Sequence, residues 1–280
     1  MASISPATRL ASPVDTATHG VYVPGEIVTF GGRITDDGEF TPRAGRYHLY
    51  GGLFCPWWHR VAITRALAGL EDVVSMSYVD GERDGRGWAF RDQYGPDPVN
   101  GFTLLRQAYE ATREGFTGHV SVPALWDRAT AQLVSNDPRA IGIDLATRFR
   151  HLATPLIDTY PEHLRDAIEE LDAWLGPAVN RGTALLEAFE QLDGRLRDSR
   201  YLLGDAVTEA DIRLWVSLVR YDVGANARRE INPGLHVYPY LWSYARDLYT
   251  IPAFAGTTDF AAFSAPGARP PDWSAPTDRA

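Results

Sequence analysis

The chain contains a single cysteine, Cys55, in a context that favours a reactive thiolate. The cysteine opens the segment CPWWHR, and an apolar stretch with helical spacing follows, so Cys55 stands immediately before a predicted helix. The amide groups and the dipole at the start of a helix stabilise an anion, so a thiol placed there ionises more readily. Pro56 fits the first helical turn, where a missing amide hydrogen costs nothing, and Arg60 adds positive potential one turn later. The alternative interpretation is an inert buried cysteine.

The pair Val122-Pro123 is a second candidate, whose chemistry would come from the backbone. It lies between a predicted loop and a predicted strand. A cis peptide bond before Pro123 would leave the N–H and C=O of Val122 open to pair with an extended, peptide-like ligand. Since most X-Pro bonds are trans, a trans bond without this role is the alternative.

Composition and charge argue against several classes of function. The net charge of −9 leaves no basic excess to neutralise phosphates, so we expect no nucleic-acid partner. One cysteine cannot form an intramolecular disulfide, and the seven histidines lack a ligand spacing such as HExxH, so we expect no metal. No apolar run approaches the roughly 18 residues of a membrane span. The start of the sequence lacks a secretory signal pattern, so we expect a cytoplasmic protein without membrane association.

The elements that must position these residues change character near residue 153. The first part alternates β-rich segments with helical patterns, which predicts an α/β unit around a small mixed sheet. Its predicted strands are 46–50, 73–79, 124–127 and 130–134, with a hairpin at 27–41 and helices that begin near residues 56, 103 and 136. The second part has helical spacing at 161–175, 181–198, 208–222 and 238–249. It therefore predicts an all-helical domain.

The helix expected at 208–222 has a recognisable start. Thr208 to Asp211 reads as a capping box, so we expect Asp211 to be structural and to accept amide hydrogen bonds there. Arg213 and Arg220 lie two turns apart on this helix, and we interpret them as salt-bridge residues.

Four segments carry a family pattern, in the order RYHLYGGLFCPWWHR, GWAF, VSVPALWDRATAQLVSND and RYLLGDAVTEADIRLWVSLVRYD. They match a CPWAHR box, a GWxF tetrapeptide, a TVPVLWD strand and a helix that begins TEADIRL. In these features the chain resembles the Xi-class glutathione transferases, the glutathionyl-hydroquinone reductases. The resemblance implies a fold class of α/β plus all-α, with a thioredoxin-like N-terminal domain followed by a helical transferase domain, usually in a homodimer.

With this resemblance, we expect the chain to divide into four parts: a flexible leader (1–24), a thioredoxin-like thiol-binding domain (25–152), a helical domain (153–262) and an irregular tail (263–280). The implied activity is reduction of an aromatic, quinone-like S-conjugate. Cys55 would attack the sulfur of the conjugate, the hydroquinone would leave, and a second thiol would resolve the mixed disulfide.

The resemblance also implies the thiol-binding residues. Trp88, in the GWxF tetrapeptide, matches the tryptophan that packs over the bound thiol. Val122 matches the residue that makes backbone bonds to its cysteinyl part, and Asp137 takes the place of the family's glutamate, which holds the γ-glutamyl group. Phe54 and Arg60 flank the cysteine and belong to the same predicted site, as does Pro123.

Two departures from the family pattern concern the substrates. The family's Asn-Glu-Ser reads Asn136-Asp137-Pro138 here, and the proline removes a hydroxyl and an amide donor from the place where a carboxylate would dock. We therefore expect the co-substrate to be glutathione or another low-molecular-weight thiol such as mycothiol. The family's tyrosine pair near the C-terminus is missing from residues 258–263, which leaves Tyr160 and Tyr221 as candidates for the acceptor pocket.

Three functions remain open from the sequence. The leading one is a thiol-dependent oxidoreductase that acts through a Cys55 mixed disulfide. The second is a thiol transferase or isomerase, in which the bound glutathione or mycothiol itself attacks and Cys55 is dispensable. The third is a non-catalytic protein that binds aromatic ligands.

Overall fold

The computed structural model describes residues 10–11 and 13–274, and these form two compact units. The first, called here the sheet unit, comprises the described residues up to Trp58 and those from Glu71 to Asp144. The second, the helical unit, comprises His59 to Leu70 and the described residues from Leu145 onward. Among all these residues, no helix is both long and apolar enough to span a lipid bilayer.

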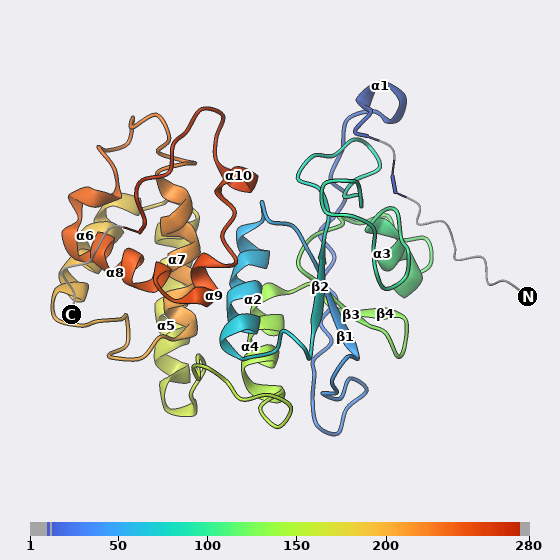
Figure 1. Cartoon of the computed structure of the whole chain (residues 1–280), viewed down its shortest axis with the longest axis horizontal. Coiled ribbons are helices and arrows are strands. Elements are labelled where there is room, and N and C mark those ends of the chain that lie inside the picture. The colour runs from blue at the N-terminus through green and yellow to red at the C-terminus, as the bar shows by residue number, and fades with distance from the viewer. Residues whose placement is uncertain (1–9, 12, 275–280) are drawn as a thin grey trace, which may run out of the picture. The chain divides into compact units, whose positions relative to one another are not determined.

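The sheet unit is built around four strands (Figure 1). They are β1 (Tyr47–Gly51), β2 (Ser75–Tyr78), β3 (Ala124–Asp127) and β4 (Gln132–Ser135). Within the described residues their order is β2-β1-β3-β4, with β1 parallel to β2 and antiparallel to β3, and β3 antiparallel to β4. All five residues of β1 are buried, as expected for a central strand covered on both faces. The predicted mixed sheet is therefore confirmed.

Short helices accompany this sheet. They are α1 (Thr16–His19), α3 (Arg106–Thr112), α2 (Pro56–Leu67) and α4 (Pro138–Arg148). Helix α3 packs against β4, while α2 and α4 each begin in the sheet unit and continue into the helical unit. Each strand, and each of the helices α2 to α4, matches a segment expected from the sequence.

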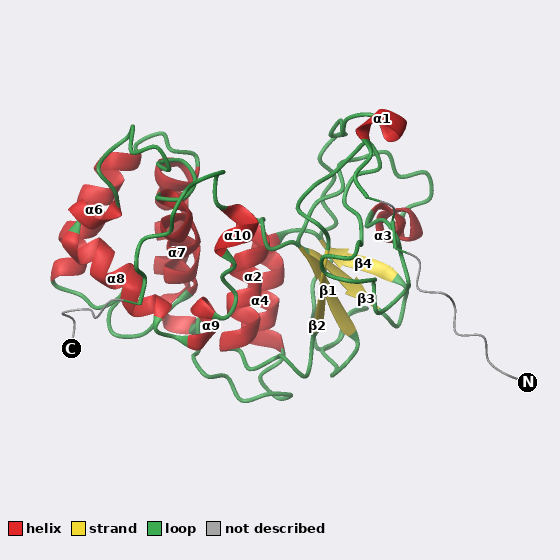
Figure 2. Ribbon diagram, turned by 45° about the horizontal axis from the view of Figure 1, so that its top comes forward, coloured by secondary structure: helices red, strands yellow, loops and turns green. Residues whose placement is uncertain are grey.

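The helical unit confirms the expected all-α character (Figure 2). Its further helices are η1 (Glu162–Leu164), α5 (Arg165–Leu175), η2 (Gly176–Asn180), α6 (Leu185–Arg197), α7 (Glu209–Tyr221), η3 (Leu235–Val237), α8 (Pro239–Tyr249), α9 (Pro252–Ala255) and α10 (Phe260–Phe263). Helix α7 packs against α5 and α8, and nearly every residue of α7 is buried. It is the central helix of the unit.

The predicted capping box at the start of α7 is confirmed. The Asp211 carboxylate accepts hydrogen bonds from the backbone amides of Thr208 at 2.8 Å and Leu202 at 2.9 Å, and from the Tyr244 hydroxyl at 2.9 Å. Arg213 forms ion pairs as expected, for example with Asp172 at 3.4 Å.

The hairpin predicted at 27–41 is wrong. This segment contains only isolated bridges, between Gly31 and Ser135 and between Ile34 and Phe40. The physical reason is that its backbone donors find partners near β4 instead: the Gly32 amide donates to the carbonyl of Val134 at 2.9 Å. A second strand is not needed to satisfy them.

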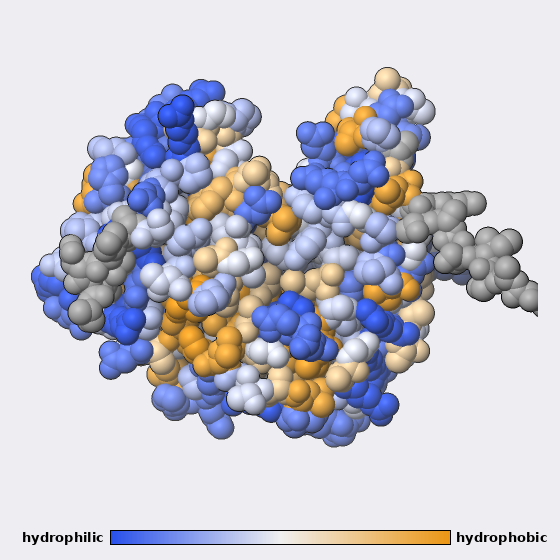
Figure 3. Space-filling model, viewed as in Figure 1, coloured by the Kyte–Doolittle hydropathy of each residue, from blue (hydrophilic) through white to orange (hydrophobic). Residues whose placement is uncertain are grey.

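The predicted leader and tail are described only in part. Residues 1–9 and 12 of the leader and 275–280 of the tail lie outside the described residues. In the described part of the leader the Ala11 amide donates to the carbonyl of Phe90, and in the tail the Trp273 side chain is buried. The boundaries between the four predicted parts stay predictions. On the face shown in Figure 3, hydrophilic and apolar side chains are interspersed.

Candidate active site

Cys55 lies at the junction of strand β1 and helix α2. The Cys55 amide donates to the carbonyl of Gly52 at 2.9 Å, which closes a tight turn after the strand, and α2 begins at the next residue, Pro56. The position immediately before a helix, expected from the sequence, is therefore confirmed. The side chain is buried, with 7% of its surface exposed.

The backbone of Val122 faces the cysteine. The thiol of Cys55 donates a hydrogen bond to the carbonyl oxygen of Val122, with 3.3 Å between sulfur and oxygen. The peptide bond between Val122 and Pro123 is cis, and both residues are buried. Two candidates that stand 67 positions apart in the sequence are thus in direct contact.

Trp88 joins the same cluster through Phe54. The two rings are stacked, with their centres 4.4 Å apart and an angle of 29° between their planes. The carbonyl of Trp88 accepts a hydrogen bond from the Leu105 amide at 2.9 Å, and the indole is 8% exposed. Because Phe54 precedes Cys55 directly, the stack places Trp88 next to the cysteine segment.

An ionic network holds the loop that carries Trp88. The buried carboxylate of Asp84 pairs with Arg86 at 2.7 Å and accepts a hydrogen bond from the amide of Asp15 at 3.0 Å. The Arg86 hydrogen bond is the largest influence that holds the pKa of Asp84 well below its ordinary value. Burial raises the pKa of a second carboxyl in this loop, Asp80, against the opposing charge of Arg91. This charge pairing fixes the loop in place.

Asp137 caps the start of helix α4. Its Oδ1 accepts hydrogen bonds from the amides of Arg139 at 2.9 Å and Ala140 at 3.3 Å. Its Oδ2 has no hydrogen-bond partner among residues 10–11 and 13–274, and the side chain is half-buried. One carboxylate oxygen therefore stabilises the helix, while the other is available to a ligand amine.

The remaining predicted site residues belong to the helical unit. Arg60 donates to the carbonyl of Arg213 at 3.3 Å. The hydroxyl of Tyr160 donates to Glu169 at 2.8 Å, and that of Tyr221 donates to Asn232 at 3.0 Å. Burial raises the pKa of Tyr221 to about 12. The structure thus gathers Phe54, Cys55, Trp88, Val122 and Pro123 in one cluster, and it gives these three side chains partners elsewhere.

Sequence analysis missed three residues that extend the cluster, namely Tyr22, Arg83 and His119. Arg83 lies five positions before Trp88 in a loop rich in charge, which is a signal that could have drawn notice. Tyr22 falls within the predicted leader, where no function was expected.

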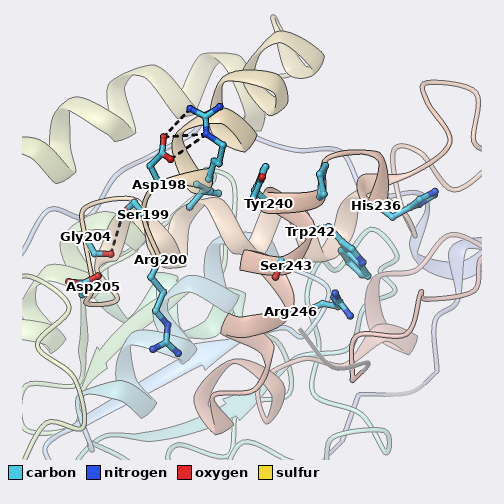
Figure 4. Close-up of a pocket in the computed structure, with 13 residues that line it drawn as sticks. Asp198, Ser199, Arg200, Gly204, Asp205, His236, Tyr240, Trp242, Ser243 and Arg246 are labelled. Carbon is cyan, nitrogen blue, oxygen red and sulfur yellow. Dashed lines mark hydrogen bonds and ion pairs between the residues drawn. The ribbon is translucent and has the colours of Figure 1, made fainter. Parts of the chain in front are cut away.

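The helical unit also contains a hollow of about 890 Å³ between the end of α6 and the start of α8 (Figure 4). Arginines 197, 200 and 246 line it together with Tyr240 and Trp242. Two of these arginines are neutralised by carboxylates, since Arg197 pairs with Asp198 and Arg200 with Asp247, both at 3.0 Å. No residue of the predicted site lines this hollow.

The sequence is similar to known glutathione transferases. The family model "Glutathione S-transferase, C-terminal domain" matches residues 158–247. Glutathionyl-hydroquinone reductase YqjG of Escherichia coli (strain K12) is 36% identical over 249 residues, which cover 81% of this chain and 75% of that protein.

Solved structures give the same result. The Xi-class transferase of Natrialba magadii superposes with a TM-score of 0.83 at 32% identity, over 90% of this chain and 89% of that one. The glutathione-bound structure of YqjG from Escherichia coli K-12 has a TM-score of 0.78 at 33% identity, over 83% of this chain and 85% of that one.

A small mixed sheet with a cysteine at the start of a helix, followed by an all-helical unit, defines a protein of the glutathione-transferase superfamily. The sequence and structural similarity over most of the chain narrows the class of protein further. The chain belongs to the Xi class of glutathione transferases, the family of the glutathionyl-hydroquinone reductases.

Proposed function

We propose that this protein is a thiol-dependent oxidoreductase that removes a low-molecular-weight thiol from an aromatic, quinone-like S-conjugate. The observation that carries the proposal is the position of Cys55: its sulfur stands at the start of α2, 3.3 Å from the Val122 carbonyl. A thiol at a helix start is suited to act as a nucleophile. The family's YqjG carries the same activity in its name, glutathionyl-hydroquinone reductase.

The chemistry proceeds in two exchanges. The Cys55 thiolate attacks the sulfur of the conjugate, a sulfur–sulfur bond forms, and the bond between sulfur and the aromatic carbon breaks. The hydroquinone leaves with the electron pair and takes up a proton. A second thiol then attacks the mixed disulfide, which returns Cys55 to its thiolate and releases the oxidised dimer of the small thiol. The two thiols supply the two electrons that reduce the aromatic product.

The residues around Cys55 take the binding roles. Trp88 and Phe54 pack over the bound thiol. The backbone of Val122, followed by Pro123, pairs with its cysteinyl part. The Oδ2 of Asp137 accepts from the α-amine of its γ-glutamyl group.

Residues of the helical unit complete the proposal. Arg60 adds positive potential for the thiolate, while Tyr160 and Tyr221 contribute to binding of the aromatic group. The hydrogen bonds that occupy both tyrosine hydroxyls favour contact through their rings.

Glutathione is the proposed co-substrate, because YqjG, from the same family, has a solved glutathione-bound structure. Mycothiol is the alternative co-substrate, and the reason lies at the start of α4. Pro138 is the first residue of that helix and has no amide hydrogen, so it removes one donor from the place where a carboxylate of glutathione would bind. The proposal also includes a homodimer located in the cytoplasm, without a metal, nucleic-acid or membrane partner.

Intact-mass spectrometry tests the proposal. Incubation with a glutathionyl-hydroquinone is expected to give free hydroquinone and a protein that carries one glutathione on Cys55. The Cys55→Ser variant changes one atom and should give neither product. Full reductive activity in this variant would overturn the proposal in favour of direct attack by the bound thiol. Absence of both reaction and adduct in the wild type would favour a non-catalytic binder.

A further inference from the structure

The guanidinium of Arg83 lies between two aromatic rings of the sheet unit. Its central carbon is 4.0 Å from the ring centre of Trp88 and 4.2 Å from that of Tyr22. A cation within about 6 Å of an aromatic face is attracted by the ring quadrupole, and the flat guanidinium also stacks on it. The Arg83 side chain has no hydrogen bond or ion pair within the described part of the chain, so these two rings are what fixes it.

On one side, this contact continues to the cysteine. Trp88 stacks on Phe54 at 4.4 Å, and Phe54 is bonded to Cys55. The order of contact is therefore Arg83, Trp88, Phe54 and Cys55. A movement of Arg83 away from Trp88 would therefore remove one contact that holds the stacked rings of Trp88 and Phe54 beside the cysteine segment.

Tyr22, the second ring beside Arg83, is also linked to the cysteine. The Tyr22 hydroxyl and Nδ1 of His119 share a hydrogen bond of 2.9 Å. His119 stands three residues before Val122, whose carbonyl accepts the Cys55 thiol hydrogen at 3.3 Å. Burial and, second, the positive charge of Arg83 lower the pKa of His119, which agrees with their closeness. Together with the chain segments 54–55 and 119–122, these contacts form a closed cycle that begins and ends at Cys55, called here the contact cycle.

The backbone on both sides of Tyr22 is anchored to the sheet unit. The Gly20 carbonyl accepts from the Gly85 amide at 2.8 Å, and the Glu26 carbonyl accepts from the His119 amide at 2.7 Å. Farther along, the side-chain amide of Asn136 donates to the carbonyl of Val28 at 2.9 Å. Tyr22 is thus held over Arg83 from both directions.

We propose that Arg83 and Tyr22 are positioning residues for the thiol half of the site. They hold Trp88 on one side of Cys55 and the 119–122 segment on the other. The inference rests on the proposed function, because it assigns the contact cycle to the binding of the same small thiol. It adds the N-terminal segment around residue 22 to that site.

Two pairs of variants test this role in the full-length protein. Arg83→Gln removes the cation and Tyr22→Leu removes the ring, whereas Arg83→Lys keeps the charge and Tyr22→Phe keeps the ring. Arg113→Gln is the matched control. Arg113 also lies over an aromatic ring, that of Phe30 at 5.2 Å, but it does not belong to the contact cycle. The thermal midpoint of each variant is recorded first.

The first measurement needs no substrate. The rate at which iodoacetamide alkylates Cys55 is expected to rise about fivefold in Arg83→Gln and in Tyr22→Leu, because loss of a cation–π contact loosens the cover of the sulfur. The double variant should show no more than the larger single effect, since both remove the same link. Arg83→Lys and Tyr22→Phe should fall between these values and the wild type.

The second measurement separates binding from chemistry. With a glutathionyl-hydroquinone, KM should rise about fivefold in Arg83→Gln and Tyr22→Leu while kcat stays within twofold, the pattern of lost uniform binding. Alkylation rates and KM values within twofold of wild type would overturn the inference, and so would equal changes in Arg113→Gln. If the two truncating variants do not fold, the Lys and Phe variants decide the question in the same way.

The outcome is distinguishable from failure of the proposed function. Should Cys55→Ser retain full reductive activity, the mixed-disulfide mechanism fails. The alkylation rates of the Arg83 and Tyr22 variants still report whether the contact cycle positions Trp88 and the 119–122 segment around the sulfur.

Discussion

The thiol of Cys55 donates a hydrogen bond to the carbonyl of Val122, with 3.3 Å between sulfur and oxygen. Both groups have roles in the proposed reaction, one as nucleophile and one as partner of the bound thiol. Two influences therefore act in opposite directions on the ionisation of the Cys55 thiol. The start of α2 favours the thiolate, whereas the carbonyl accepts from the neutral thiol.

The first prediction is that the helix has the larger effect. A thiol is only a weak hydrogen-bond donor, while helix starts are among the sites where thiols ionise well below the free value of about 8.5. The rate of alkylation of Cys55 by iodoacetamide, followed from pH 5 to 10, should reach half its maximum below that pH. A free cysteine in a short peptide is the control. A midpoint at or above the peptide's would remove the physical basis of the proposed nucleophile.

The second prediction concerns the stacked indole of Trp88. Trp88→Ala should raise the KM for a glutathionyl-hydroquinone about tenfold, because it removes an aromatic contact of about 1.4 kcal/mol with the thiol. Trp57→Ala is the control, since the Trp57 side chain is 45% exposed and stands in the same cysteine segment. Steady-state kinetics of both variants decide the matter. Equal KM values in the two variants would contradict a special role for Trp88.

The third prediction concerns the choice of thiol at the start of α4. Pro138→Ser supplies an amide hydrogen and a hydroxyl where the native residue has neither, and the start of a helix binds carboxylates. The dissociation constant for glutathione should fall about fivefold, which corresponds to one added hydrogen bond. Calorimetric titration with glutathione and with mycothiol measures this effect. If the native protein binds mycothiol tightly and glutathione hardly at all, glutathione is not its co-substrate.

The fourth prediction concerns stability. Asp211→Ala removes the acceptor of four buried donors, namely the amides of Leu202 and Thr208 and the hydroxyls of Thr208 and Tyr244. The free energy of unfolding should fall by about 3 kcal/mol or more. Urea unfolding is the measurement, and Asp198→Ala is the control because the Asp198 carboxylate is 73% exposed. An unchanged urea midpoint in Asp211→Ala would show that the capping box is dispensable.

The fifth prediction is a pH dependence from His59. Burial and, second, the Arg220 charge keep the pKa of His59 well below 6.5. Arg220 donates to its Nδ1 at 2.8 Å, so the neutral ring carries its hydrogen on Nε2, which faces Thr257 at 3.2 Å. The folded protein keeps this ring neutral, while the unfolded chain protonates it below about pH 6.5. The unfolded state then binds more protons, so stability falls as the pH falls.

The loss should amount to at most about 1.4 kcal/mol per pH unit for this one group. Urea unfolding of the wild type and of His59→Gln from pH 5 to 8 measures it. The variant should lose less stability between pH 7 and 5 than the wild type does. Parallel curves for the two proteins would exclude His59 as the source.

Much of this architecture could be predicted because its signals are local. Helical spacing located α5 to α8, the proline after Cys55 located the start of α2, and the motif from Thr208 to Asp211 located the start of α7. Each of these signals lies within a few residues of the feature that it predicts. The hairpin at 27–41 was wrong for the opposite reason, since the partners of its backbone stand about 100 positions later, as in the bond from Gly32 to Val134.

The candidate site shows the same division. Cys55 and the pair Val122-Pro123 could be recognised from the residues themselves, and the family pattern added Trp88. The sandwich of Arg83 between Trp88 and Tyr22 could not be recognised, because Tyr22 and Arg83 are distant in sequence and no periodicity links them. Contacts of this kind depend on how loops fold over one another, and a linear pattern carries little record of them.

The oxygen opposite the Cys55 sulfur belongs to the main chain, and this limits what genetic screens can detect. A deep mutational scan exchanges side chains only, so every variant at position 122 retains the carbonyl that lies 3.3 Å from the Cys55 sulfur. Such a scan therefore reports on the side chain of Val122 and not on its carbonyl. Chemical synthesis that replaces this carbonyl oxygen with sulfur, a weaker acceptor, keeps Pro123 in place and is the substitution able to reveal its contribution.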